Sequence, residues 1–67
     1  MLTDIEISII KLICKGLDNN SIANTISLPY NQVKVLVSVI LKKMNVRNKT
    51  HLAFVWGQHE SKKLKNK

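Results

Sequence analysis

The sequence has little of several residue types on which small proteins and enzymes commonly depend. Its 67 residues include one cysteine, Cys14, so no internal disulfide forms, and its place in an apolar helical stretch predicts a buried, reduced thiol. Only four residues are acidic, and no glycine-rich phosphate loop or nucleophile elbow is present. We therefore expect neither an enzyme nor a bound cofactor. Aromatic residues make up 4% of the chain, which predicts an aliphatic core.

Signals for a membrane, for secretion and for a metal site are also missing. No secretory hydrophobic region follows Met1, and the longest nearly apolar run, residues 35–41, is interrupted by Ser38. That run is far shorter than the roughly 20 residues of a membrane helix. His51 and His59 have no cysteine or acidic residue at ligand spacing. The sequence therefore predicts a soluble chain in the cytoplasm, without a metal.

Basic residues are what the chain has in excess, and they are unevenly distributed. Lys and Arg number 11, which gives a net charge of +7. Residues 1–33 carry a net charge of −1, and residues 34–67 carry +8. The asymmetry favours a basic face in the second half that binds a polyanion such as nucleic acid or an anionic membrane surface. A basic surface that only improves solubility is the alternative.

The first half of the sequence predicts two helices with clear starts. Thr3 and Glu6 have the spacing of a capping box, and Gly16 is suited to end a helix in the left-handed conformation. These signals predict a helix over residues 4–15, with a buried stripe of Ile5, Ile9, Leu12 and Ile13. Asp18 is a favourable N-cap for a short helix over residues 19–26, which would bury Ile22, Ala23 and Ile26.

Pro29 marks the start of a third helix, because proline is tolerated in a first helical turn. The helix is expected over residues 30–44, with one apolar stripe made of Val33, Val37, Ile40, Leu41 and Met44. The β-branched residues within 33–41 also allow a strand on local propensity. No second strand-forming run exists to pair with it, so the helix is preferred.

The last helix is expected over residues 49–60. Asn45 is suited to cap the helix before it, and Asn48 to cap its own start. Its apolar stripe consists of Leu52, Val55, Trp56 and His59. Residues 62–67 are basic and poor in apolar groups, so we expect a disordered tail behind a single domain of residues 1–61.

The expected helices 19–26 and 30–44 are joined by three residues, which is typical of a helix-turn-helix motif. Specific residues then appear in a recognisable order. They are Leu2-Thr3, Glu6, Gly16-Leu17, Asn19, Ile22-Ala23, Ile26, Leu28, Val33-Lys34, Ser38, Ile40, Lys43-Met44, Val46-Arg47-Asn48, Thr50 and Leu52-Ala53. From residue 2 to about residue 56 this order resembles the LuxR-type (NarL/GerE) DNA-binding domain, without a gap.

The resemblance implies an all-α, compact four-helix domain whose helix-turn-helix segment is 19–38. It implies a sequence-specific transcription regulator in the bacterial cytoplasm, associated with the nucleoid when bound. The third helix would enter the major groove of double-stranded DNA, and the fourth would pair in a homodimer. The implied base-reading residues are Asn31, Lys34, Val35 and Ser38.

The other implied roles concern the DNA backbone and the second copy of the chain. The expected phosphate contacts are Gln32, Lys42, Lys43, Arg47 and Lys49. For Lys42 and Lys49, a solvated surface charge is an equal alternative. The expected dimer contacts are Leu52, Val55, Trp56 and His59, with the core as an equal alternative for Trp56. The side-chain chemistry fits base reading, because lysine donates to guanine, asparagine pairs with adenine and valine suits the thymine methyl.

The chain departs from the family pattern at several positions of the motif. Gln32 and Leu36 stand where many members carry Thr and His, Ser21 stands in place of Glu, and Pro29 in place of a capping Ser. Lys34 is the only cation within residues 30–41. A second hypothesis follows, in which Leu36 and Val39 form an apolar surface that binds or sequesters another regulator.

Overall fold

The structure is a computed structural model that describes the backbone of residues 1–65 and the side chains of residues 1–58. All regular structure in this part of the chain is helical, which confirms the predicted all-α fold and excludes the strand at residues 33–41. The helices are α1 (Asp4–Cys14), α2 (Asn19–Ile26), α3 (Tyr30–Lys43) and α4 (Lys49–Lys65). In the described residues no helix is long and apolar enough to cross a membrane.

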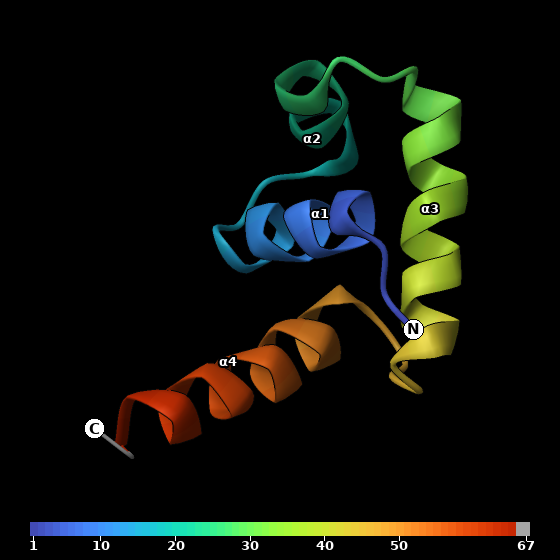
Figure 1. Cartoon of the computed structure of the whole chain (residues 1–67). Coiled ribbons are helices and arrows are strands. Elements are labelled where there is room, and N and C mark those ends of the chain that lie inside the picture. Colours follow the sequence, from blue (N-terminus) through green and yellow to red (C-terminus); the bar gives the residue numbers. More distant parts are fainter. Residues whose placement is uncertain (66–67) are drawn as a thin grey trace.

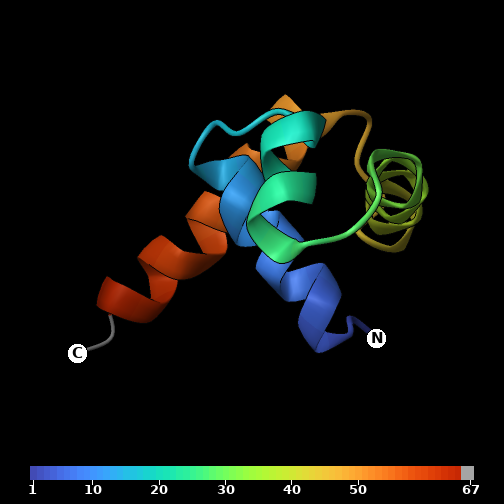
Figure 2. The ribbon, with the colours of Figure 1, turned by 90° about the horizontal axis from the view of Figure 1, so that it is seen from above.

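α1 lies at the centre of the fold and contacts each of the other three helices. Figure 1 shows α2 above it, α3 along one side and α4 below. Figure 2 looks along α3 and shows the other helices on one side of it. The opposite side of α3 is therefore left uncovered by the fold.

Three of the helices begin at side-chain caps that the sequence predicts. The Thr3 hydroxyl accepts a hydrogen bond from the Glu6 N–H at 3.1 Å, and the Glu6 carboxylate accepts one from the Thr3 N–H at 2.8 Å. Asp18 accepts from the Ser21 N–H at 2.8 Å, and Asn48 accepts from the His51 N–H at 2.8 Å. The helix α3 differs, because it begins after Pro29 with no side-chain cap.

The first three helices end in the same way, at a residue with positive φ. These residues are Gly16 (φ 91°), Ser27 (φ 60°) and Asn45 (φ 57°). The next residue in each case donates its N–H to the carbonyl five positions back, which closes the last turn. The sequence predicts the first and third of these ends. Ser27 is the unexpected one, and it turns the chain from α2 into α3.

The core is aliphatic, as predicted, and all four helices contribute to it. Its members are at most 6% exposed and consist of Ile9, Ile10, Ile13, Ile22, Ala23, Val33, Val37, Ile40 and Leu52. Half-buried side chains that include Leu36 and Trp56 pack around this cluster. Because three core residues come from α3, its rotation about its own axis is fixed by packing.

Two predictions for α1 are wrong, and both follow from the direction in which it faces the core. Ile5 is 51% exposed, whereas Ile10, outside the predicted stripe, is completely buried. Because α1 is covered by three helices, its buried arc is wide and is centred on the side that holds Glu6, Ile10 and Ile13. Cys14 lies outside this arc and is exposed, so the predicted buried thiol is also wrong.

The predicted end of the last helix is wrong as well. α4 continues to Lys65, past the expected end at residue 60, so residues 62–65 belong to the helix. Lysine has a good helix propensity, and cations near a helix C-terminus interact favourably with the helix dipole. Residues 66–67 lie outside the described part of the chain.

Candidate nucleic-acid interface

The outer side of α3 presents a row of exposed, mostly polar side chains. Figure 2 shows this side facing away from the other helices. Tyr30 is 44% exposed and Val35 is 61% exposed. The other exposed residues in the first three turns are Asn31, Gln32, Lys34 and Ser38. Positions three, four and seven apart share one face of a helix, so the four predicted base-reading residues lie together on one surface.

The opposite side of the same helix is buried. Val33 and Ile40 are 0% exposed and Val37 is 5% exposed. These residues hold α3 against α1 and α2 and leave its outer side chains directed to solvent. Leu36 and Val39 are half-buried, and Leu36 packs against the core. The apolar surface of the second hypothesis is thus only partly accessible.

Lys34 rests over the ring of Tyr30. Its ammonium nitrogen lies 5.6 Å from the ring centroid, within the range of a cation–π interaction. The sequence of α3 contains no acidic residue, and the ion pair found among the described side chains joins Lys43 to Glu6. The sequence analysis assigned no role to Tyr30, although its i, i+4 spacing from Lys34 is the signal that would have identified the pair.

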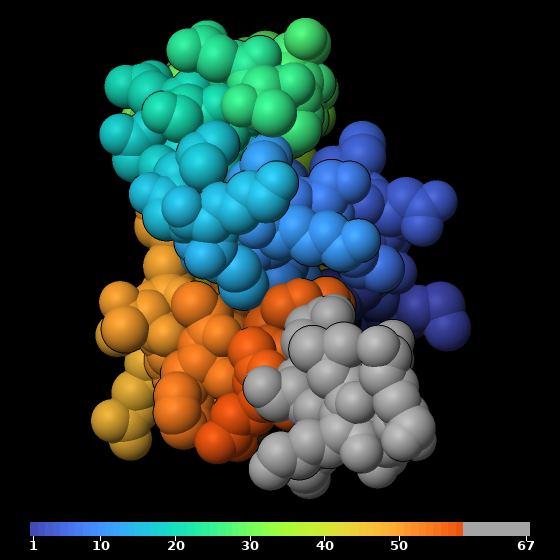
Figure 3. All heavy atoms as spheres, turned by 90° about the vertical axis from the view of Figure 1, so that its left-hand side faces the viewer, coloured from blue at the N-terminus to red at the C-terminus, as the bar shows by residue number. Residues whose placement is uncertain are grey.

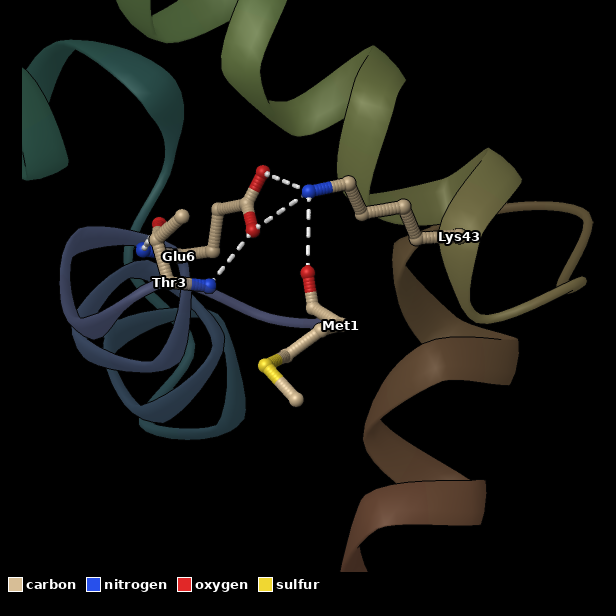
Figure 4. A network of polar contacts seen from close by, with 4 residues as sticks. All are labelled: Met1, Thr3, Glu6 and Lys43. Atoms are coloured by element: carbon tan, nitrogen blue, oxygen red, sulfur yellow. Dashed lines mark hydrogen bonds and ion pairs between the residues drawn. The ribbon is translucent and has the colours of Figure 1, made fainter.

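Lys43 is held by α1. Figure 4 shows its ammonium between the Glu6 carboxylate and the Met1 carbonyl. The distances are 3.0 Å to each Glu6 oxygen and 3.1 Å to the Met1 oxygen. Glu6 is 4% exposed, and the Thr3 N–H, followed by Lys43, lowers the pKa of its carboxyl. Lys43, predicted as a phosphate contact, takes part in this ion pair while its side chain stays 36% exposed.

The other predicted phosphate contacts lie near the two ends of α3. Gln32 is exposed in its first turn and Lys42 in its last. Arg47 is exposed in the connection to α4, where its N–H donates to His51 Nδ1 at 3.2 Å. Lys49 is half-buried, and its ammonium donates to the Asn19 side chain at 2.9 Å. Two of these groups thus lie at the ends of α3, and the other two follow it in the chain.

The predicted dimer residues of α4 do not share one environment. Leu52 is completely buried in the core of its own chain, so its prediction as a dimer contact is wrong. Val55 and Trp56 are half-buried, and the side chain of His59 lies outside the described residues. Phe54, which the sequence analysis did not select, is 63% exposed. Figure 3 shows residues 49–58 of α4 accessible on the side of the molecule that lies opposite α3 in Figure 1.

Comparisons with known proteins agree with the motif. The model of the bacterial regulatory proteins of the LuxR family matches residues 1–56. The chain is 39% identical over 59 residues to the response regulator protein VraR of Staphylococcus aureus, Staphylococcus saprophyticus and Staphylococcus epidermidis. The match covers 88% of this chain and 28% of each relative, so the chain spans less than a third of their length. No solved structure matched the chain.

Proposed function

Because the chain belongs to the LuxR family of bacterial regulatory proteins, whose members are DNA-binding transcription regulators, we propose that it binds specific DNA sequences through α3. The observation that carries the proposal is the geometry of this helix. Its inner side is fixed in the core, and its outer side presents Asn31, Lys34 and Ser38 to solvent. A major groove roughly 12 Å wide accommodates one α-helix in this orientation.

The exposed side chains suit the edges of the bases. Lys34 donates to guanine O6 and N7, and Asn31 at the start of α3 pairs with adenine. Val35, which is 61% exposed, fits the thymine methyl. Ser38 follows one turn later and both donates and accepts. Each good contact of this kind discriminates against a wrong base by about 1–3 kcal/mol.

Phosphate contacts position the helix in the groove. We assign them to Gln32, Lys42, Arg47 and Lys49. Lys49 donates to Asn19 with one N–H and keeps two donors for a phosphate. The first turn of α3 carries no side-chain cap, so its backbone N–H groups are suited to the same task. Lys43 has the same predicted role and also forms the ion pair with Glu6.

Two copies of the chain are proposed to pair through α4 on DNA. Half-sites about 34–36 Å apart then present the same groove face to both copies. Val55 and Trp56 keep the role predicted for them, Leu52 does not, and the exposed Phe54 is added. Because α4 is accessible opposite α3, as Figure 3 shows, pairing leaves the DNA-binding face uncovered. This function places the chain in the bacterial cytoplasm, at the nucleoid when bound.

The test of the proposed function is selection of a binding site from a randomised duplex pool. Fluorescence anisotropy then compares the selected duplex with an unrelated one across a salt series. We expect tighter binding to the selected duplex, and a loss of about 1–3 kcal/mol on that duplex for Lys34→Ala. No enrichment and no binding at low salt would overturn the proposal.

One observation favours a second candidate function. Val35 is 61% exposed and adjoins the half-buried Leu36 and Val39, so α3 carries an apolar strip beside its polar row. Such a strip suits a protein-interaction module that sequesters another regulator. In that case Val39→Lys abolishes copurification of the partner while the chain stays folded. For a DNA-binding α3, the added cation strengthens duplex binding at low salt.

A further inference from the structure

Tyr30 is an aromatic residue in an unusual place. It is the first residue of α3, it is 44% exposed, and it does not belong to the core. The chain contains one residue each of Tyr, Trp and Phe, so few aromatic rings exist to be used at all. Burial in the core therefore does not explain why an aromatic residue stands at this position. We look for the explanation in the contacts of Tyr30 on the surface of α3.

The ring of Tyr30 lies against the ammonium of Lys34. The two residues are one turn apart, and the ammonium nitrogen lies 5.6 Å from the ring centroid. Helical side chains lean toward the N-terminus of their helix, so the Lys34 chain extends in the direction of Tyr30. The Tyr30 ring thus lies in the direction in which the Lys34 side chain extends.

This contact restricts the side chain that the proposed function uses to read guanine. A free lysine samples many rotamers, and ordering them on a base opposes binding. An ammonium that already rests on a ring has lost part of this freedom before DNA arrives. It touches the ring with one side, and its outward N–H groups remain available to a base.

We propose that Tyr30 is a positioning residue for DNA readout, whose ring holds the Lys34 ammonium in the pose that meets the base edge. The proposal rests on the proposed function of α3. It says that Tyr30 contributes to discrimination between base pairs through Lys34 and contributes little to sequence-independent affinity. Lys34 alone touches the base pair concerned.

Two substitutions of Tyr30 are expected to differ in effect, because one keeps the aromatic ring and the other removes it. Tyr30→Phe keeps the ring and the cation–π contact, and Tyr30→Leu keeps an apolar side chain without a ring. Because Tyr30 lies outside the core, both variants are expected to keep the thermal unfolding profile of the wild-type chain. Circular dichroism checks this before binding is measured.

The experiment is a double-mutant cycle with the full 67-residue chain. Anisotropy gives the affinity for the selected duplex, for the same duplex with its Lys34-contacted base pair replaced, and for an unrelated duplex. We expect Tyr30→Leu to lower discrimination between the first two by about two- to fivefold. Tyr30→Phe is expected to match the wild type. In a Lys34→Ala background, Tyr30→Leu is expected to have no further effect.

Three results would overturn the inference, and they differ from a failure of the proposed function. The first is that Tyr30→Leu discriminates between the selected duplex and the duplex with the replaced base pair as well as the wild type does. A loss by Tyr30→Leu that persists in the Lys34→Ala background is the second, because Tyr30 would then act without Lys34. A loss of equal size on the unrelated duplex is the third. A wild-type chain that binds no duplex would instead refute the proposed function, and the inference with it.

Discussion

Lys43, in the last turn of α3, donates hydrogen bonds to both carboxylate oxygens of Glu6, on α1, at 3.0 Å each. Among the side chains that the structure describes, Glu6 is the one charged group that is buried, and the same carboxylate caps the start of α1 through the Thr3 N–H. A single acidic residue therefore fixes the beginning of one helix and the end of another. The proposed DNA-reading helix is thereby tied to the centre of the fold.

The first prediction concerns the pH dependence of stability. The pKa of Glu6 in the folded chain lies below its ordinary value of 4.5, because the ionised carboxylate accepts from the Thr3 N–H and from Lys43. Its stabilising contribution is present above pH 4.5 and is lost as the pH falls through the folded-state pKa. We expect Glu6→Gln to lower Tm at neutral pH, and the difference from wild type to shrink in acid.

Thermal unfolding followed by circular dichroism measures this difference. Asp18 also has a lowered pKa, chiefly because its carboxylate accepts from the Ser21 N–H. The wild-type chain and Glu6→Gln therefore share the pH dependence that comes from Asp18. Asp4→Asn is the matched control, because it removes a carboxylate from the same helical turn and leaves the Lys43 ion pair intact. A Tm difference between Glu6→Gln and wild type that is the same at neutral and acidic pH would contradict the prediction.

The second prediction separates two neighbouring lysines of α3. Lys42→Ala is expected to lower affinity equally for all duplexes, and to reduce the slope of log K against log salt by about 0.9. Lys43→Ala is expected to lower Tm instead, because Glu6 is left buried without its cation. Binding isotherms at several salt concentrations, together with melting curves, check both variants. Equal salt slopes for Lys42→Ala and wild type would contradict the phosphate role.

The third prediction applies one substitution to both glycines. Gly16 has φ 91°, a conformation unfavourable to other residues, so Gly16→Ala is expected to destabilise the chain by about 1–2 kcal/mol. Gly57 lies within α4 with open space around it, so Gly57→Ala is expected to stabilise the chain by about 0.5–1 kcal/mol. Urea denaturation gives both values. Changes of the same sign would show that one of the two backbone assignments is incorrect.

The fourth prediction distinguishes the core from the dimer surface of α4. Leu52→Ala is expected to cost about 2–5 kcal/mol of stability, because it empties a fully buried site. Phe54→Ser changes an exposed residue, so the free energy of unfolding should stay within about 0.5 kcal/mol. Its effect should appear in sedimentation on DNA with two half-sites, as weaker binding of the second copy. Cooperative binding that is unchanged in Phe54→Ser would argue against this surface.

Local patterns predicted most of the helices and caps. Thr3, Asp18 and Asn48 were identified as caps because a cap acts within one helical turn. The end of α4 was missed because the lysine-rich residues after 60 have low hydrophobicity but good helix propensity. Helix propensity therefore decides this end of the helix, and apolar content does not.

The parts that the sequence did not predict depend on distant residues. The Glu6–Lys43 ion pair joins positions 37 residues apart, and the Lys49–Asn19 bond joins positions 30 apart. Leu52 was assigned to the dimer because an apolar stripe does not reveal whether it faces its own core or a second copy. Only the packing of α4 against α1 decides that question.

The measurement that tests the central claim most directly is chemical-shift mapping of the ¹⁵N-labelled chain during titration with its selected duplex. The central claim is that the exposed face of α3 contacts the bases. We predict the largest changes at the amides of Asn31, Lys34, Val35 and Ser38, with smaller changes at Lys42 and Arg47. Changes confined to α1 and α4, with the amides of α3 unmoved, would contradict it.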